Sequence, residues 1–343
     1  MIVDKYRPED RGEIDAMFRR VFGTEAADAS TARWEWQYRQ NPHAGGPEIW
    51  IARDAGTIVG QYATMPVRLS LSGREIDASW GMDVMVAPER QRQGLGELLF
   101  RTWDRHTGAS LGMGLSTGSH RLFRKLKWPD VGPVPCLIKP VSARGFATAR
   151  WPSSLNRIVS LAAGPLVAVL RSRAASQDVR TVRDFDKRFT ELWERVAPKF
   201  TFAVRRDAAY LRWKYLALPH IRYDIIALDR GPGVAGYAVY RHIDEPRGRV
   251  TALVDLLADP DDRPATADLL RAVEREARNA GSDKIRAFIM NDAFRTTMRR
   301  EGYFQVHSTI ELVAKINSVA VDPDFYASTG AWHVTFGDSD QDR

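Results

Sequence analysis

Residues 84–100 combine a β-rich apolar run, a polar turn and two glycines in an arrangement that could bind an anion. The apolar run ends at Pro88, and a helix is expected to begin at Gly94. The first N–H groups of a helix have no intrahelical partner, and the helix dipole adds roughly half a positive charge there. Because Gly94 and Gly96 lack a Cβ, a phosphate could approach their backbone closely. The spacing predicts a pyrophosphate-binding turn, although a lone G-x-G is also compatible with a simple tight turn.

The turn has the pattern Gln/Arg-x-x-Gly-x-Gly/Ala, with V-x-V-x-P-E immediately before it. This combination resembles the coenzyme A signature of the GNAT N-acetyltransferase superfamily, whose defining positions are occupied by Gln91, Gly94 and Gly96. The segment is similar to the version found in bacterial ribosomal-protein N-acetyltransferases. It is neither a Walker loop, because Gly-Lys-Ser/Thr is missing, nor a Rossmann G-x-G-x-x-G.

The resemblance implies acetyl-CoA as co-substrate and no metal. In the family, the strand before the turn diverges from its neighbour, and its backbone pairs with the pantetheine amides. By position, the pantetheine would contact Val84, Met85 and Val86. The pyrophosphate would be held by the turn, which comprises Gln91, Arg92, Gln93, Gly94, Leu95 and Gly96. Simple core burial also explains the apolar run, and the two interpretations are compatible because the expected contact is through backbone.

The chain repeats one plan. The frame Trp-x-Tyr-x-x-x-Pro-His occurs at 36–43 and again at 213–220, and the segment 83–89 aligns with 255–261. Each copy predicts the order helix, helix, strand hairpin, long strand, helix, strand, helix, strand. We therefore expect an α/β protein of two tandem GNAT-like domains, each a mixed, mainly antiparallel sheet flanked by helices. The expected boundaries are a first domain 1–142, a linker helix within 143–179, a second domain 180–315 and a C-terminal extension 316–343.

Only the first copy has the glycines of the turn. The second copy has Arg263-Pro264-Ala265-Thr266-Ala267-Asp268 at the corresponding positions. Pro264 lacks a backbone donor, although proline is favourable at a helix start, and Asp268 would place a carboxylate where a phosphate should lie. We expect the second copy to be structural or to form a wall of the substrate pocket.

Acetyl transfer needs an oriented thioester, an amine lone pair, and stabilisation of charge on the carbonyl oxygen and the departing sulfur. Many members of the family place a tyrosine after the last short helix to protonate the thiolate. Phe123 occupies that position here and has no hydroxyl. The candidate catalytic residues are therefore Asp83, beside the predicted coenzyme strand, and His120, at the end of the next strand.

Each candidate also has a structural explanation. Asp255 occupies the place of Asp83 in the second copy, which favours a role in the fold, and His120 is also typical of a surface histidine near a helix start. The aromatic residues of the repeated frame, such as Trp36 and Trp213, are more typical of core packing than of a pocket that stacks on a substrate.

The C-terminal residues 332–336 alternate in polarity and predict a strand, followed by an acidic segment. An exposed tail is the default expectation for such a segment. Its carboxylates could also attract a cationic amine, so Asp338 and Asp340 are candidate acceptor-site residues.

Composition and charge limit the classes of protein and the cellular compartments that the sequence fits. The formal net charge is +7, but the basic residues are scattered, and no nucleic-acid-reading motif is present. The single cysteine, Cys136, fits a reducing compartment, and the N-terminus lacks the apolar core of a signal peptide. The apolar run 158–170 is shorter than the roughly 20 residues of a membrane span. We expect a cytoplasmic protein without a transmembrane segment, for which peripheral membrane contact stays compatible with this run.

These observations predict an acyl-CoA-dependent N-acyltransferase, most simply an N-acetyltransferase. An amine would attack the thioester directly in a ternary complex. An amino sugar, a sugar nucleotide or a peptide would suit a pocket between two domains. One alternative is a non-catalytic acyl-CoA sensor or assembly protein, which the absence of a hydroxyl at Phe123 favours. Another is a FemAB-like aminoacyl transferase, which the intact glycine turn disfavours.

Overall fold

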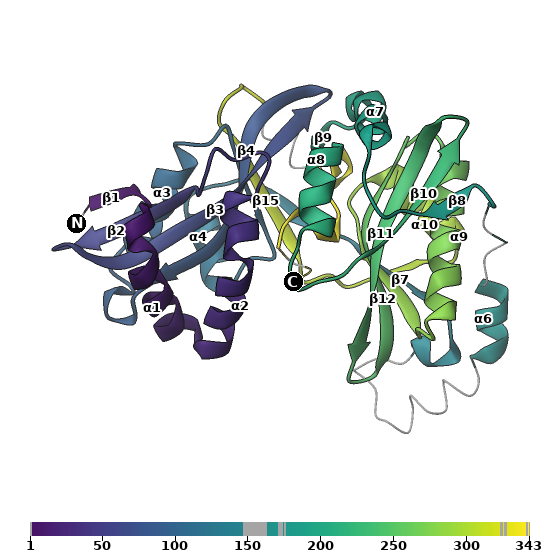
Figure 1. Cartoon of the computed structure of the whole chain (residues 1–343), viewed down its shortest axis with the longest axis horizontal. Helices are drawn as coiled ribbons and strands as arrows, with labels where there is room; N and C mark the ends of the chain where they lie inside the picture. The colour runs from purple at the N-terminus through teal and green to yellow at the C-terminus, as the bar shows by residue number, and fades with distance from the viewer. Residues whose placement is uncertain are drawn as a thin grey trace.

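Two mixed β-sheets lie side by side in the computed structural model of the chain, each with helices packed against it (Figure 1). The structure describes residues 2–146, 163–170, 174, 176–322, 325, 328–340 and 342. The first half of the chain forms most of the left-hand sheet in Figure 1, and the second half forms most of the right-hand sheet. The predicted α/β architecture with two mainly antiparallel mixed sheets is confirmed.

The first sheet has the strand order β1-β2-β3-β4-β5-β15-β6. Its strands are β1 (Ile2–Lys5), β2 (Ile49–Asp54), β3 (Thr57–Leu71), β4 (Arg74–Val86), β5 (Ala109–Met113), β15 (Glu311–Ile316) and β6 (Asp130–Pro133). Along this path only β4 and β5 run parallel. The far end of β3 also pairs with β9 (Phe202–Val204), to which β16 (Trp332–His333) is added.

Four helices cover the two faces of this sheet. They are α1 (Arg11–Phe22), α2 (Thr24–Trp34), α3 (Leu95–Asp104) and α4 (Thr117–Lys125). Successive strand residues point to opposite faces. In β2, Ile49 and Ile51 therefore pack with α1 and α2, whereas Trp50 and Ala52 pack with α3 and α4. The apolar residues of both faces are buried, so β2 lies between two helical layers.

The second sheet has the order β14-β7-β13-β12-β11-β10-β8. Its strands are β14 (Phe304–Val306), β7 (Cys136–Pro140), β13 (Lys284–Phe288), β12 (Gly248–Ala258), β11 (Gly233–Glu245), β10 (Asp224–Arg230) and β8 (Val179–Thr181). The helices of this half are α6 (Gly164–Leu170), α7 (Lys187–Val196), α8 (Ala208–Leu211), α9 (Arg263–Asn279) and α10 (Asp292–Arg300). As in the first sheet, a single pair on the path, β12 with β13, is parallel.

In addition to β9 and β16, which the second half places beside β3, the two halves exchange one strand on the main path of each sheet. Strand β7 follows the first half in sequence but lies between β13 and β14 of the second sheet, and β15 lies between β5 and β6 of the first sheet. Each exchanged strand carries a lysine that forms an ion pair with its host half: Lys139 Nζ lies 2.5 Å from Glu274 Oε2, and Lys315 Nζ lies 2.5 Å from Asp104 Oδ2. The sheets therefore do not separate at the expected boundaries 1–142 and 180–315. Both closing strands are short and mostly apolar, and this composition does not specify the sheet that receives them.

The repeated tryptophans meet where the two halves join. Trp36 and Trp213 stack with ring centroids 4.8 Å apart, and each indole Nε1 donates to the main-chain oxygen of the other, at 2.6 and 2.7 Å. Both residues lie in short π-helical turns, Glu35–Arg39 and Arg212–Leu216. This reciprocal contact relates the two copies by an approximate two-fold and gives the repeated frame a packing role.

Only part of the expected linker can be described. Residues 147–162 lie outside the described part of the chain, whereas Gly164–Leu170 is helical. No helix among the described residues is long and apolar enough to cross a membrane.

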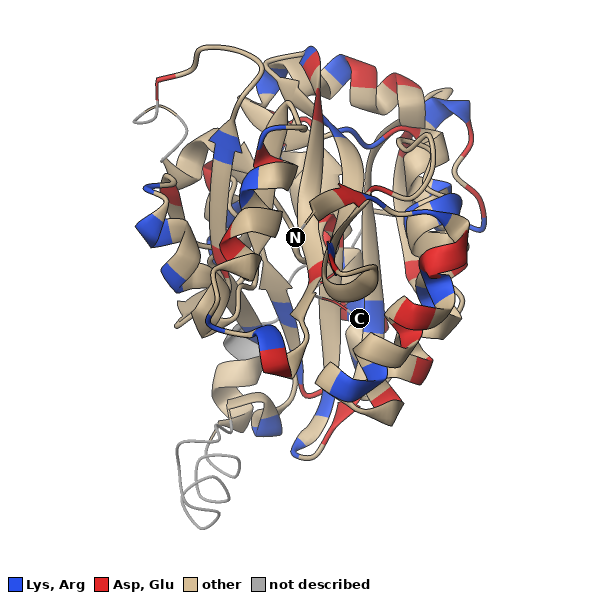
Figure 2. Cartoon of the chain, turned by 90° about the vertical axis from the view of Figure 1, so that its left-hand side faces the viewer, with Lys and Arg blue, Asp and Glu red and all other residues tan. Residues whose placement is uncertain are grey.

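Figure 2, which views the molecule from the side of the first half, shows basic and acidic residues interspersed on that side.

Candidate functional site

Strands β4 and β5 diverge in the middle of the first sheet. They pair in parallel at Ser79–Ser110 and Trp80–Leu111, after which β4 runs on to Val86 while β5 ends at Met113. A strand edge whose N–H and C=O groups face an opening can pair with an extended ligand as an added strand would. The predicted pantetheine residues 84–86 lie on this diverging part of β4.

A bulge in β4 turns Asp83 out of the regular ladder. On β3, Gln61 pairs with Met85 and Ala63 with Met82, so two residues of β4 oppose one residue of β3. Asp83 has φ +40°, a backbone conformation that is uncommon and strained for a residue other than glycine. Bulges of this kind re-aim side chains beside functional sites.

A cleft of about 420 Å³ opens at this bulge. Helices α1 and α2 form one wall, the diverging strands form the floor, and the start of α4 and one residue of the C-terminal segment complete it. The lining residues are Phe18, Phe22, Ala26, Ala29, Arg33, Gly81, Met82, Asp83, Val84, Met113, Gly114, Leu115, Ser116, Ser119 and Asp340. The cleft thus combines an apolar wall with carboxylate, guanidinium and hydroxyl groups.

The carboxylate of Asp83 is held by residues at the end of α2 and in the turn that follows. Tyr38 donates its hydroxyl at 2.8 Å and Gln37 its amide at 3.2 Å to Oδ2, while Arg33 Nη2 lies 3.5 Å from Oδ1. Arg33 was not predicted from the sequence, because nothing in the local pattern connects it with a strand residue fifty positions later. These contacts fix the carboxylate at the cleft wall.

The glycine turn leads directly from β4 into α3. Gly94 is the N-cap, with φ +81°, and within the described chain no side chain caps this helix. A Cβ added to Gly94 or Gly96 would meet open space, and residues 91–94 are exposed. The amides of Gln91 and Gln93 brace the turn by donating to the carbonyl oxygens of Val86 and Glu89, at 3.2 and 3.1 Å. The first N–H groups of α3 therefore face a space that an anion can enter.

The equivalent turn of the second half is closed. Helix α9 begins at Arg263, which aligns with Gln91, so helix replaces the turn. The side chain of Asp262 caps it by accepting from the N–H of Ala265 at 3.0 Å. Asp268, predicted to occupy the phosphate position, instead lies within α9 and pairs with Arg271 at 3.3 Å. The predicted position of Asp268 was therefore wrong. Helix α9 begins earlier than α3 does in the first half, so Asp268 lies beyond the first helical turn.

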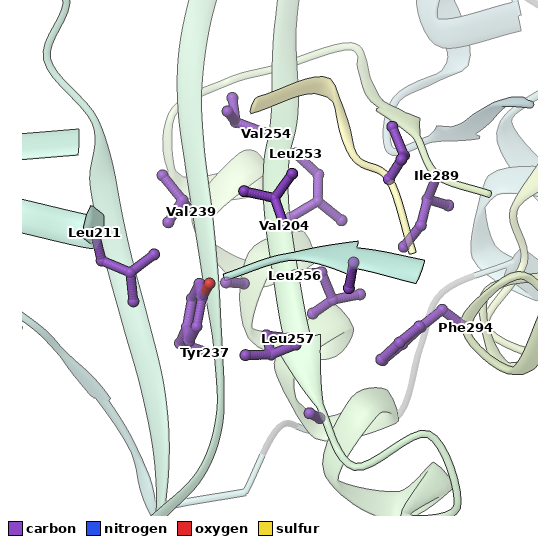
Figure 3. Close-up of a cluster of buried hydrophobic side chains, with 14 of the residues drawn as sticks. Val204, Leu211, Tyr237, Val239, Leu253, Val254, Leu256, Leu257, Ile289 and Phe294 are labelled. Atoms are coloured by element: carbon purple, nitrogen blue, oxygen red, sulfur yellow. The ribbon is translucent and has the colours of Figure 1, made fainter. Parts of the chain in front are cut away.

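The opening between β12 and β13 is filled by the C-terminal segment. The strands pair from Val250–Lys284 to Leu253–Ala287 and then diverge, and Thr335 bridges to Ile289 across the gap. Apolar side chains that include Leu253, Leu256 and Ile289 gather in this region (Figure 3). The second half therefore offers neither an open strand edge nor an uncapped helix where the first half has both.

The C-terminal segment is not the exposed tail expected by default. Asp338 is 2% exposed, and its Oδ2 accepts from Arg206 Nη2 at 2.6 Å and from the N–H of Thr335 at 2.7 Å. It cannot serve as an acceptor-site residue, because its carboxylate is buried in these contacts. Asp255, the counterpart of Asp83, pairs with the same arginine at 3.2 Å. Asp340, in contrast, lies at the cleft of the first half.

His120 lies beside the cleft and is not among its lining residues. Its Nε2 is 3.0 Å from Glu311 Oε2 and 3.5 Å from Asp130 Oδ2. Helix α4, which carries it, is capped by Ser116, whose Oγ accepts from the N–H of Ser119 at 3.2 Å. The structure thus places Asp83 in the lining of the cleft, the glycine turn beyond that lining at the end of the same strand, and His120 in a separate cluster of charged groups.

Three other residues weighed from the sequence have structural surroundings. Phe123 is buried edge-to-face against Phe100 in the aromatic cluster under α3. It has a packing role there and, as a phenylalanine, offers no hydroxyl. Burial lowers the pKa of His43 to about 4, and its ring stacks on Tyr210 of the other half. Burial raises the pKa of the Cys136 thiol to about 11, which keeps it protonated at neutral pH and unsuited to act as a nucleophile.

Comparison with known proteins identifies a domain in the first part of the chain. Residues 3–117 match a family model described as an acetyltransferase (GNAT) domain. Among curated proteins, none matches the sequence. A GCN5-related N-acetyltransferase from Anabaena variabilis has a TM-score of 0.63 at 14% identity, with 92% of this chain and 72% of that chain covered.

Two further solved structures share the fold across both sheets. A probable N-acyltransferase from Enterococcus faecalis has a TM-score of 0.60 at 14% identity, covering 92% of this chain and 72% of that one. Saccharomyces cerevisiae N-myristoyltransferase with bound myristoyl-CoA has a TM-score of 0.56 at 10% identity, covering 91% and 82%. At these identities the likeness concerns the fold alone. Residues 3–117 therefore form a GNAT acetyltransferase domain, and these solved structures share the fold of both sheets of the chain.

Proposed function

We propose that this protein is an acyl-CoA-dependent N-acyltransferase that binds its donor in the first half of the chain. The observation that carries the proposal is the contrast between the two halves. In the first half, β4 and β5 diverge toward an uncapped helix with open space at both glycines. In the second half, the corresponding opening is filled by the C-terminal segment and the helix is capped by its own Asp262.

The proposed donor follows the path of β4. The backbone of Val84, Met85 and Val86 would pair with the pantetheine amides, and the N–H groups of residues 91–96 would hold the pyrophosphate. This arrangement directs the thioester to the bulge and the cleft. Acetyl is the acyl group that we assign, with acetyl-CoA as co-substrate.

The acceptor would enter through the cleft as a primary amine. Its nitrogen attacks the thioester carbonyl carbon, a C–N bond forms and the C–S bond breaks, and the thiolate leaves. We assign Asp83 as the group that accepts the proton from the amine, directly or through a water molecule, because its carboxylate lines the cleft. Asp340 adds a second negative group at the same opening, which favours a cationic acceptor. The catalytic role predicted for His120 has no comparable support, since His120 lies outside the cleft lining.

Gly96→Glu tests the donor site. Gly96 has open space around it, so the fold should tolerate a side chain there. A carboxylate about 5 Å from a phosphate adds repulsion of about 1–3 kcal/mol, a loss of roughly 5- to 150-fold in affinity for acetyl-CoA. The matched control is Gly96→Gln, which has nearly the same size without the charge. Isothermal titration calorimetry measures both, and unchanged affinity in Gly96→Glu would contradict the proposed site.

A non-catalytic acyl-CoA-binding protein is the second candidate, because Phe123 provides no hydroxyl for the departing thiolate. Mass spectrometry of the purified chain with acetyl-CoA and a pooled amine library separates the two functions. The enzyme proposal predicts release of free CoA together with a product 42 Da heavier than one amine, the mass of an added acetyl group. Binding of acetyl-CoA without any product across the library would select the binding protein.

A further inference from the structure

A cluster of one imidazole and two carboxylates lies at the junction of three elements outside the cleft. His120 comes from α4, Asp130 from the start of β6, and Glu311 from the start of β15, the strand that the second half contributes to the first sheet. Their ligand atoms all lie within 4.8 Å of one another. We infer that these three side chains form a binding site for a first-row divalent cation, with Zn²⁺ as the best-suited ion.

The two separations between the imidazole nitrogen and the carboxylate oxygens suit a single ion. His120 Nε2 lies 3.0 Å from Glu311 Oε2 and 3.5 Å from Asp130 Oδ2. Two atoms that each bind one ion at about 2.1 Å are roughly 3.0 Å apart at a right angle and roughly 3.4 Å apart at a tetrahedral angle. The cluster therefore needs only small side-chain adjustments to close around a metal.

The imidazole nitrogen gives a second, independent indication. His120 Nε2 is buried, and among the described residues it has no hydrogen-bond partner. Its contact with Glu311 Oε2 has a hydrogen-bonding distance without being a hydrogen bond, so the oxygen does not lie along the N–H direction. Ligand atoms that share an ion have this off-axis arrangement, because the ion lies along the nitrogen lone pair.

The chemistry of the ligands selects the class of ion. A neutral imidazole with two carboxylates has a charge of −2, which a divalent cation balances. Imidazole nitrogen favours Zn²⁺ and its first-row neighbours over Mg²⁺ and Ca²⁺, which prefer an all-oxygen set. The side chains of Asp130 and Glu311 are 40% and 38% exposed, so water can complete the coordination. Arg124 Nη2 lies 3.9 Å from Asp130 Oδ2, and its exposed side chain leaves it free to move aside.

The site would join the two halves of the chain. Glu311 sits where β15 enters the first sheet, and its carbonyl oxygen accepts from the N–H of Gly114 at the cleft at 3.1 Å. A metal bound there would link β15 to α4 and β6, so its binding free energy would add to the stability of the fold. This inference does not depend on donor binding, because none of the three ligands belongs to the glycine turn or to residues 84–86.

Titration of tag-free protein with ZnCl₂ after dialysis against a chelator tests the site. Isothermal titration calorimetry should give one equivalent of Zn²⁺, with affinity lowered at least tenfold by Glu311→Gln and by His120→Ala. Glu191→Gln, at an exposed glutamate of α7, is the matched control and should leave the affinity unchanged. Co²⁺ should bind with visible absorption bands that the same two variants abolish.

The possible results separate cleanly. Absence of Zn²⁺ binding to the unmodified chain would overturn the inference, as would binding that Glu311→Gln and the isosteric Asp130→Asn both leave unchanged. If His120→Ala does not fold, these two isosteric carboxylate variants decide the outcome. Acetyl-CoA titrated in parallel distinguishes this failure from failure of the proposed function, because each ligand has its own binding curve.

Discussion

Glu274 provides the buried carboxylate to which the exchanged strand β7 is anchored. Lys139 Nζ of β7 lies 2.5 Å from Glu274 Oε2, with side chains 1% and 4% exposed. Arg278 Nη2 contacts the other carboxylate oxygen at 2.6 Å. Glu274→Gln keeps the shape of the side chain and removes its charge, so two cations then face a neutral amide in a buried position.

The expected loss can be bracketed from the structure. Removal of one partner of a buried ion pair costs about 3–5 kcal/mol. Burial already lowers the pKa of Lys139, so loss of its carboxylate partner favours loss of its proton. A lysine of ordinary pKa that is neutralised at pH 7 costs about 4.8 kcal/mol, from roughly 3.5 pH units at 1.36 kcal/mol each. Because deprotonation limits the penalty on Lys139, we expect Glu274→Gln to lower the free energy of unfolding by about 3–5 kcal/mol.

Urea unfolding followed by tryptophan fluorescence measures this loss. The matched control is Asp104→Asn, because Lys315 on the other exchanged strand is 37% exposed, so loss of its ion pair should cost less than loss of the buried pair. The folded state with a lowered Lys139 pKa binds fewer protons than the unfolded chain, so the stability of Glu274→Gln should rise relative to the unmodified chain from pH 7 toward pH 9. Equal losses in the two variants, or a deficit independent of pH, would refute the argument.

Two further predictions concern Asp83 at the bulge of β4 and Asp338 in the C-terminal segment. Asp83→Asn should lower the turnover number by at least about 100-fold, because the proposed proton acceptor is lost. The Kd for acetyl-CoA should stay unchanged, because the donor contacts remain. Steady-state kinetics and calorimetry measure the two quantities, and a loss of donor affinity in proportion to the loss of turnover would contradict the prediction. Asp338→Asn should destabilise the fold by about 2–3 kcal/mol, since Arg206 keeps only Asp255 as a carboxylate partner, without weakening acetyl-CoA binding. Thermal denaturation measures the first effect, and weakened donor binding would show that the second opening is not independent of the first.

Local patterns predicted the elements that carry the proposed donor site. The helix expected from Gly94 to about residue 106 is observed at Leu95–Asp104, and its glycine N-cap and open turn follow from a few neighbouring residues. Such features depend on backbone geometry and on missing Cβ atoms, and both can be predicted from a few consecutive residues. The approximate repeat could be predicted for the same reason, because each copy has the same order of local helix and strand patterns.

Long-range choices between similar partners were not predictable. Strands β7 and β15 are both short apolar strands, and each sheet offers the same kind of edge, so the sequence pattern does not distinguish pairing within a half from exchange between halves. Asp338 belongs to an acidic, apparently solvent-directed segment, and only Arg206, far away in the chain, makes its burial favourable. Arg33 was missed in the same way, since its partner Asp83 is set by the bulge in β4.

The second half influences the first even though its own opening is filled. It supplies β15, which extends the first sheet beyond β5 and brings Glu311 beside His120. Its C-terminal segment fills the gap between β12 and β13 and then continues to the cleft, where Asp340 lies opposite the wall formed by α1 and α2. The second copy thus lacks the glycine turn but still contributes residues to the cleft of the first half. Under the proposed function, a cleft lined by residues of both halves would restrict which amines reach Asp83, and selection of the acceptor would then depend in part on the half that does not hold the donor.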